Sequence, residues 1–218
     1  MAAVSEGVIK FAAEHAHRPL PAHELGGLAD ELLGWRAVLH QLGLVGRDPT
    51  RYEGAAYGNL SARLAPFGSE PGHRPFLVTG TQTGGKPDLG ESDLCVVSFY
   101  DYHRNFVRSR GAVLPSSESM THGAVYDLWG SVRFVFHVHA PRVWRAARKL
   151  DLPATRDEVA YGTPEMALEV QRLFRTTALR SLGVFVMGGH EDGVVAFGPT
   201  ARDTGAALLE VVARAHRA

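Results

Sequence analysis

The stretch Phe134-Val135-Phe136-His137-Val138-His139 decides the fold, because it has the character of a buried strand that ends in two histidines. Apolar, aromatic and β-branched residues, which are enriched in strands, fill it. Side chains point to alternate faces of a strand, so His137 and His139 leave the same face. Two imidazoles aimed at one point supply two of the ligands that a zinc-type ion needs. The alternative is that both are buried histidines that hydrogen-bond to the backbone where an edge strand ends.

Two further segments add candidate site residues to this strand. Upstream, Pro115-Ser116-Ser117-Glu118 is typical of a helix start with a carboxylate in its first turn, and downstream His190 is a third candidate ligand. Three histidines and a carboxylate indicate a catalytic metal site rather than a structural one. Glu118 is either a general acid/base there or an ordinary helix-start glutamate that favours the helix dipole. His122, one turn later on the same helix face, is either a partner of the site or a packing residue.

Three polar segments that contain glycine or serine predict a phosphate site. They are Gly58-Asn59-Leu60-Ser61, Thr81-Gln82-Thr83-Gly84-Gly85 and Ser116-Ser117. Each alone is typical of a turn. Together they offer hydroxyls, an amide and free backbone N–H groups, which suit a phosphate group. The glycine-rich P-loop with its lysine is absent, so the sequence does not indicate a nucleoside triphosphate.

Length, composition and charge limit the class of protein. The chain has 218 residues, 45% of them apolar, which is enough for one sizeable core in a single domain. Lys+Arg and Asp+Glu are both 23, so the net charge is zero and nothing resembles the basic surface of a nucleic-acid binder. The sequence shows neither a secretory h-region nor a membrane-spanning apolar run, so we expect a cytoplasmic protein without membrane partners. The one cysteine, Cys95, lies in a strand-like run and is expected to be buried.

Hydrophobic periodicity and capping signals predict helices and strands that interleave along the chain. Helices are expected at about 24–44, 116–129, 163–179 and from 201 to the end, and strands at 76–78, 94–100, 132–139, 184–187 and 194–197. Gly26, Gly27 and Gly34 weaken the prediction of the first helix. The interleaving predicts an α/β or α+β class, and periodicity alone does not give the strand order.

Taken in order, these motifs resemble the class II aldolase/adducin family. The resemblance is carried by Gly58-Asn59-Leu60-Ser61-Ala62-Arg63, Thr83-Gly84, Pro115-Ser116-Ser117-Glu118 with His122, His137-x-His139 and Gly162-Thr163-Pro164-Glu165. It runs from about Gly58 to the C-terminus, and its most specific part is the pairing of S-S-E with H-x-H. Within the family, the chain is similar to the L-fuculose-phosphate-type aldolases.

The resemblance implies a fold, an assembly and a set of site residues. The fold would be α/β, a single three-layer α/β/α domain over residues 1–218 around a mostly antiparallel central sheet. The assembly would be a homotetramer with sites at subunit interfaces. His137, His139 and His190 would bind zinc or another divalent metal, and Glu118 would match the catalytic glutamate. The phosphate-binding positions would be Asn59, Thr83, Gly84, Ser116 and Ser117.

Two departures from the family pattern concern candidate site residues. The third ligand usually stands in a His-Gly pair, but here Glu191 and Asp192 separate His190 from Gly193, so either carboxylate could ligate in its place. In addition, the short link between the H-x-H strand and Tyr161 lacks the stretch in which the fuculose-phosphate enzymes carry a catalytic tyrosine.

The resulting hypothesis is a divalent-metal-dependent aldolase, a lyase that cleaves or forms a carbon–carbon bond in a sugar phosphate through a metal-stabilised enediolate. The family's epimerases usually have aspartate where this chain has Glu118, which favours the aldolase. One alternative, favoured by the missing tyrosine stretch, is a related sugar-phosphate dehydratase or decarboxylase. The other is a non-catalytic metal-binding protein on the same fold.

Overall fold

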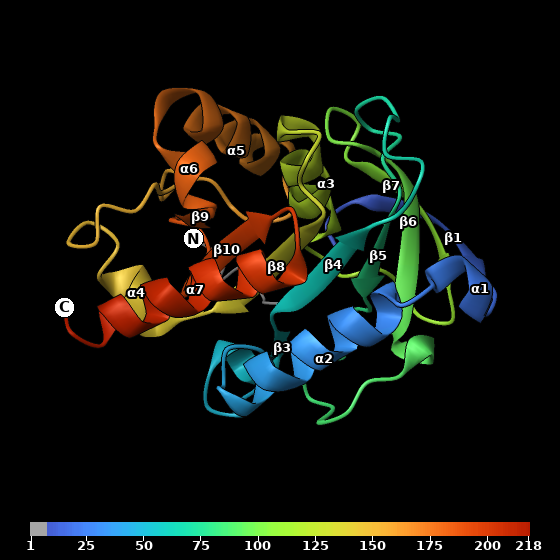
Figure 1. Cartoon of the computed structure of the whole chain (residues 1–218), viewed down its shortest axis with the longest axis horizontal. Helices are drawn as coiled ribbons and strands as arrows, with labels where there is room; N and C mark the ends of the chain where they lie inside the picture. The colour runs from blue at the N-terminus through green and yellow to red at the C-terminus, as the bar shows by residue number, and fades with distance from the viewer. Residues whose placement is uncertain (1–7) are drawn as a thin grey trace.

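A mixed eight-stranded sheet runs through the whole molecule (Figure 1), in a computed structural model that describes residues 8–218. Its strands, in spatial order, are β1 (Ala12–His17), β7 (Phe106–Gly111), β6 (Leu94–Asp101), β5 (Phe76–Thr79), β4 (Asn59–Arg63), β8 (Phe134–His139), β10 (Gly193–Gly198) and β9 (Val184–Val186). The β1–β7 pair is parallel and every other neighbouring pair is antiparallel. The predicted mostly antiparallel sheet is therefore confirmed.

Helices cover both faces of this sheet and give the predicted three layers (Figure 1). One face carries α2 (Leu28–Gln41), α4 (Pro141–Arg145) and α7 (Ala201–Ala215). The other carries α3 (Ser119–Leu128), α5 (Pro164–Thr176) and α6 (Leu179–Leu182). Short elements lie between these, namely α1 (Ala22–Leu25), β2 (Gly46–Arg47), β3 (Ala56–Tyr57) and the 3₁₀ turns Tyr52–Gly54 and Glu91–Asp93.

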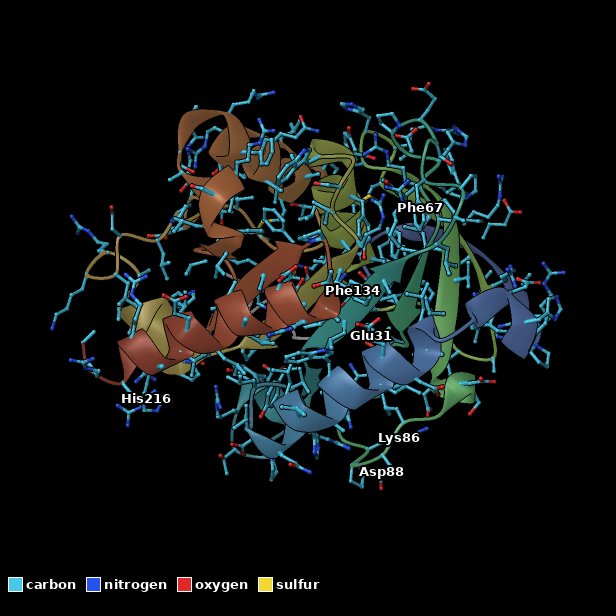
Figure 2. All side chains as sticks on the ribbon, in the orientation of Figure 1. Glu31, Phe67, Lys86, Asp88, Phe134 and His216 are labelled. Carbon is cyan, nitrogen blue, oxygen red and sulfur yellow. The ribbon has the colours of Figure 1, made fainter. Side chains whose placement is uncertain are left out.

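The alternation of side chains along β8 divides the core in two. Phe134, Phe136 and Val138 pack against the α2/α7 layer, and Figure 2 labels Phe134 beside the start of α7. Val135 belongs to the α3/α5 core. Because residues two apart share a face, His137 and His139 also face the α3/α5 layer. This parity directs both histidines toward the start of α3, where Glu118 stands.

Strand pairing brings the polar residues of β4 next to these histidines. Asn59 lies opposite His137 in the antiparallel β4–β8 ladder. Leu60 and Ala62 pack into the α2/α7 core, so Asn59 and Ser61 face the α3 layer with the histidines. In the Gly58–Arg63 motif, Leu60 and Ala62 therefore contribute to the core, while Asn59 and Ser61 lie on the face of the site.

The predicted elements are found, with several differences at their ends. Gly26 has a φ of 55°, so the helix expected from 24 divides into α1 and α2. The helix expected over 163–179 ends at Thr176, and α6 follows. α3 begins at Ser119, which places Glu118 at the N-cap rather than in the first turn. Strands β1, β4 and β7 of the main sheet and the two-residue strands β2 and β3 were not predicted.

Cys95 is fully buried in β6, as expected, and burial raises the pKa of its thiol to about 12. Within residues 8–218 no helix is both long and apolar enough to cross a membrane.

Candidate active site

The structure brings the three predicted ligand histidines together. His137, His139 and His190 are all buried, and one ligand nitrogen of each lies within 4.8 Å of those of the others. The ring centroids are 4.9 to 5.2 Å apart. His137 and His139 come from the end of β8, and His190 comes from the turn between β9 and β10. This arrangement fits the donor set of a zinc-type site with three protein ligands.

A tight turn explains how His190 reaches the cluster although two residues separate it from Gly193. The backbone N–H of Gly193 donates to the carbonyl of His190 at 2.9 Å, and Met187 N–H donates to the carbonyl of Gly193 at 2.9 Å. A Cβ on Gly193 would stand 3.0 Å from that His190 oxygen, so glycine is favoured there. The turn presents His190, and not Glu191 or Asp192, to the other two histidines.

Burial keeps the strand histidines in the form that binds metal. Desolvation, followed by the neighbouring imidazoles, lowers the pKa of His137 well below its ordinary value. Desolvation also lowers the pKa of His139 well below that value, with further contributions from His190 and Arg51. Both rings are therefore neutral at neutral pH, as a ligand imidazole must be. The Asn59 amide lies 3.2 Å from His137 Nδ1, and the buried Nε2 has no hydrogen-bond partner among residues 8–218.

Glu118 joins this cluster from the start of α3. Its side chain is buried, and Oε1 lies 3.6 Å from His190 Nδ1. The other oxygen, Oε2, accepts a hydrogen bond from Thr121 Oγ1 at 2.9 Å. The carboxylate is thus held in place beside the three histidines, close enough to exchange a proton with a molecule bound there.

His122 packs beneath the cluster as a neutral histidine. Its Nδ1 lies 2.6 Å from Ser61 Oγ, which lies 2.7 Å from the hydroxyl of Tyr126. Complete burial lowers the pKa of His122 to about 3. His122 is therefore not one of the three clustered candidate ligands, and it joins α3 to β4 directly behind them.

All five predicted phosphate-binding residues line one small cavity. Its lining is Ala56, Gly58, Asn59, Gly80, Thr81, Gln82, Thr83, Gly84, Ser116 and Ser117. A Cβ on Gly84 would come within 2.5 Å of the Gly46 carbonyl oxygen, so the loop can pack there only with glycine. Ser116 and Ser117 lie in the turn before α3, and the Ser116 hydroxyl accepts a hydrogen bond from the Glu118 N–H at 3.3 Å. Asn59 belongs to this cavity and also contacts His137, so it connects the two halves of the site.

Arg36 supports this cavity and was not predicted from the sequence. Its buried guanidinium donates to three carbonyl oxygens of the cavity loop, those of Gly84 at 2.9 Å, Thr83 at 3.3 Å and Pro87 at 2.6 Å. Figure 2 shows Lys86 and Asp88 on the same loop, below α2. The sequence signal that could have indicated a buried role for Arg36 is its position four residues after Leu32, on the apolar face of α2.

Three tyrosine rings surround the histidine cluster, and the sequence did not predict them there. Tyr52 and Tyr57 lie against His139, with centroids 4.5 and 5.2 Å from its ring. Tyr161 stacks on His190 at 4.5 Å with an interplanar angle of 28°. No spacing motif in the chain predicts these contacts, because the three rings come from separate loops and a short strand.

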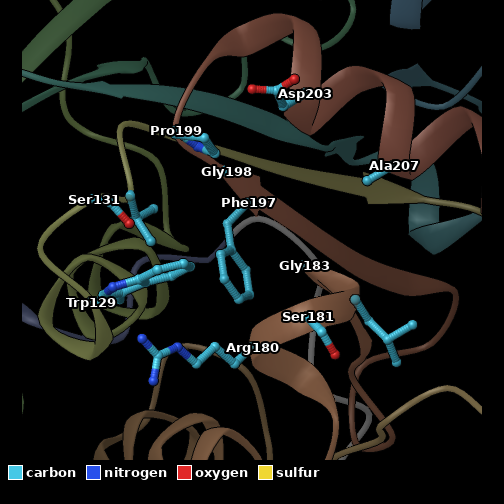
Figure 3. Close-up of a pocket in the computed structure, with 12 residues that line it drawn as sticks. Trp129, Ser131, Arg180, Ser181, Gly183, Phe197, Gly198, Pro199, Asp203 and Ala207 are labelled. Carbon is cyan, nitrogen blue, oxygen red and sulfur yellow. The ribbon is translucent and has the colours of Figure 1, made fainter.

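Another cavity, shown in Figure 3, lies away from the predicted residues. Trp129, Phe197 and Arg180 line it, and the Arg180 guanidinium stacks on the Trp129 ring at 4.7 Å. It adjoins Gly198, which pairs with Phe134 at the start of β8, whereas the histidines stand at the end of that strand. This cavity is therefore separate from the site.

Comparisons with known proteins agree with this fold. The family model for the class II aldolase and adducin N-terminal domain matches residues 50–217. No curated protein matches the chain.

Solved structures share the fold at low sequence identity. A sugar-phosphate aldolase from Thermotoga maritima is 15% identical with a TM-score of 0.64, over 88% of this chain and 94% of its own. An L-fuculose 1-phosphate aldolase is 20% identical with a TM-score of 0.63, over 90% and 87%. The L-fuculose-1-phosphate aldolase of Thermus thermophilus is 22% identical with a TM-score of 0.56, over 85% and 86%.

Proposed function

The chain belongs to the class II aldolase and adducin N-terminal domain family, and from this we propose that it is a divalent-metal-dependent aldolase acting on a sugar phosphate. One observation carries the proposal. Three buried histidines and a buried carboxylate meet at the end of β8, next to a cavity lined by the five predicted phosphate-binding residues. A metal site and a phosphate site in contact are what a small phosphorylated substrate needs.

In the proposed site, His137, His139 and His190 would hold the metal, with zinc favoured by three neutral imidazoles. A divalent ion there supplies a Lewis acid that stabilises negative charge on the substrate's oxygens. The phosphate would lie in the cavity of Asn59, Thr83, Gly84, Ser116 and Ser117, which fixes the carbon chain relative to the histidines. Arg36 stabilises that loop by donating hydrogen bonds to its carbonyl oxygens.

Glu118 would transfer a proton to or from the reacting carbon of the substrate. In the cleavage direction the electron pair of the broken carbon–carbon bond stays on the phosphorylated fragment, and Glu118 donates a proton to that carbon. In the synthesis direction its carboxylate removes the same proton. The hydroxyl group that becomes the aldehyde must also lose a proton. Residues 140–160 contain no tyrosine to receive it, and the tyrosine rings that lie against the histidines are those of Tyr52, Tyr57 and Tyr161.

The absence of a tyrosine from residues 140–160 favours a second candidate, a sugar-phosphate decarboxylase. Loss of carbon dioxide also leaves an electron pair on carbon for Glu118 to protonate, but the departing group needs no base for a hydroxyl proton. The same histidines, Glu118 and phosphate cavity would serve both reactions. The chain would act in the cytoplasm on small molecules in either case.

Metal analysis and paired product assays test this proposal. The purified protein should hold about one divalent metal per chain, and replacing His137 with Ala should abolish retention at neutral pH because a lost ligand removes much of the binding energy. His216→Ala, at the exposed end of the chain, is the matched control. Full metal content in His137→Ala would disprove the site.

The activity assay should follow two products from a set of phosphorylated sugars and sugar acids. Release of a triose phosphate supports the aldolase, and release of carbon dioxide supports the decarboxylase. A protein that loads metal and releases neither product would rule out both reactions and leave the dehydratase and the non-catalytic alternatives.

A further inference from the structure

The loop that precedes β3 reaches the histidine cluster through Tyr52. The ring of Tyr52 meets the ring of His139 edge-on, with centroids 4.5 Å apart and an interplanar angle of 76°. Its hydroxyl donates a 2.6 Å hydrogen bond to Asp192 Oδ2. Arg51 Nη2 donates to the same carboxylate oxygen at 2.8 Å and also contacts the Tyr52 hydroxyl. This loop therefore contacts the candidate ligand His139 through the Tyr52 ring, and it donates two hydrogen bonds to the Asp192 carboxylate.

Asp192 connects the Arg51–Tyr52 loop to the segments that carry the three candidate ligands. It stands two residues after His190 in the same turn and is 4% exposed. Its backbone carbonyl accepts a 2.8 Å hydrogen bond from the N–H of Ala140, the residue that follows His139. Asp192 thus joins the turn that carries His190 to the end of the strand that carries His137 and His139.

Backbone conformation shows that these contacts hold both segments in place. Tyr52, Glu53 and Asp192 have φ values of 50°, 55° and 63°, the left-handed region that residues other than glycine seldom occupy. Such conformations persist where the surrounding contacts determine them, and they gather at functional sites. Here both ends of the Tyr52–Asp192 hydrogen bond are in this conformation.

Asp192 is one of the two residues that depart from the usual His-Gly pair. Its carboxylate is engaged by Arg51 and Tyr52, and it does not join the group of three histidines. Asp192 therefore has a role that its position in the sequence did not reveal. Its carboxylate binds the turn that carries His190 to the loop of Arg51 and Tyr52.

We propose that Arg51, Tyr52 and Asp192 form a clamp that positions His190 against the strand histidines and so sets the affinity of the metal site. The inference rests on the proposed metal site. The clamp acts through the turn and the ring contact, so its members are positioning residues and not metal ligands. Partners that orient metal ligands commonly change metal affinity by about 10- to 100-fold when they are removed.

Tyr57 provides a matched control. Its ring also lies against His139, at 5.2 Å, but its hydroxyl is directed at the carbonyl of Gly43, at 3.4 Å. Tyr52→Phe and Tyr57→Phe remove the same atom from two rings that touch the same histidine. Only the first change breaks the clamp.

The experiment measures cobalt(II) and zinc affinity of the metal-free full-length chain by competition with a chromophoric chelator. The variants are Tyr52→Phe, Tyr57→Phe, Asp192→Ala, Asp192→Asn and the double variant Tyr52→Phe/Asp192→Ala. Tyr52→Phe should weaken affinity about 10-fold and change the visible cobalt spectrum, while Tyr57→Phe should match the wild type in both. Asp192→Asn, which keeps an oxygen that accepts from Tyr52, should lose less than Asp192→Ala. The double variant should be no weaker than Asp192→Ala, because both changes remove one shared contact.

Four results would overturn the clamp. The first is wild-type affinity in Tyr52→Phe and Asp192→Ala. The second is an additive loss in the double variant. The third is a complete loss in Asp192→Ala with no effect in Tyr52→Phe, which would make Asp192 a ligand. The fourth is a lower melting temperature of the metal-free variants with unchanged affinity, which would make the contact structural. A wild-type chain that binds neither metal would instead disprove the metal site, and the clamp with it.

Discussion

Glu118 is the residue on which the proposed chemistry depends most directly. Replacing it with Gln keeps the shape of the side chain but removes its ability to exchange a proton, so kcat should fall by roughly 10²–10⁴ while metal content is kept. Steady-state kinetics of product release, together with metal analysis, measure this. Glu165→Gln is the control, since Glu165 also stands at a helix start but is exposed. Equal activity of the two variants would reduce Glu118 to an N-cap residue.

His122 makes the metal-free protein sensitive to acid. Burial lowers the pKa of His122 from its ordinary 6.5 to about 3, so between these values the unfolded chain binds a proton that the native chain does not. The stability that depends on neutral His122 is therefore fully present above pH 6.5 and is lost as the pH falls toward 3, by up to about 1.4 kcal/mol per pH unit. Urea unfolding at about pH 7.5 and about pH 5.5, on either side of the ordinary histidine pKa, should show a smaller loss for His122→Gln than for the wild type. An equal loss in both proteins would contradict this account.

The site residues show what a sequence can reveal about chemistry. That His137 and His139 share a face could be predicted from strand parity, which acts over two residues. That Glu118 lies beside them was expected from the family resemblance alone. The Arg51–Tyr52–Asp192 contacts were not, because they join two loops 140 residues apart that carry no repeated spacing.

Among the elements, the loop of the proposed phosphate cavity depends on α2. Arg36→Met should leave three carbonyl oxygens of that loop without their donor, at a cost in folding free energy of roughly 1.5–3 kcal/mol for each strong charged bond. The loop should then hold phosphate less well. The shift in melting temperature that inorganic phosphate causes should shrink in Arg36→Met and persist in Arg47→Met, whose guanidinium bonds the Gly54 carbonyl instead. A phosphate shift of wild-type size in Arg36→Met would show that the loop keeps its shape alone.

The elements themselves were predictable where one face was uniformly apolar. β8 and β6 have continuous apolar runs, and α7 has a capped start at Thr200, which accepts a hydrogen bond from the Asp203 N–H at 3.0 Å. β4 was not predicted because its five residues, although they alternate between polar and apolar, overlap the segment Gly58-Asn59-Leu60-Ser61, which was interpreted as a polar turn. β1 was missed because five of its six residues are exposed, and only pairing with β7 makes it a strand.

For the whole molecule, the family resemblance predicts a homotetramer. Light scattering at micromolar concentration should give four times the 23.6 kDa mass of the chain. Closed symmetric assemblies of this kind are common among homo-oligomers, and a neighbouring chain is also where a base for the hydroxyl proton could come from. A monomeric protein with full aldolase activity would show that one chain holds every group the reaction needs.

The pairing of Asn59 with His137 also gives the sheet a part in choosing substrate length. One residue lines the phosphate cavity and the other stands among the candidate ligands, and their Cα atoms are neighbours in a ladder whose spacing is set by backbone hydrogen bonds. Movements of the surrounding loops leave the spacing of these two Cα atoms unchanged. If phosphate and metal bind as proposed, we expect a molecule with one carbon more or fewer between its phosphate and its metal-binding oxygens to bind less well, because the paired strands β4 and β8 fix the position of Asn59 relative to His137.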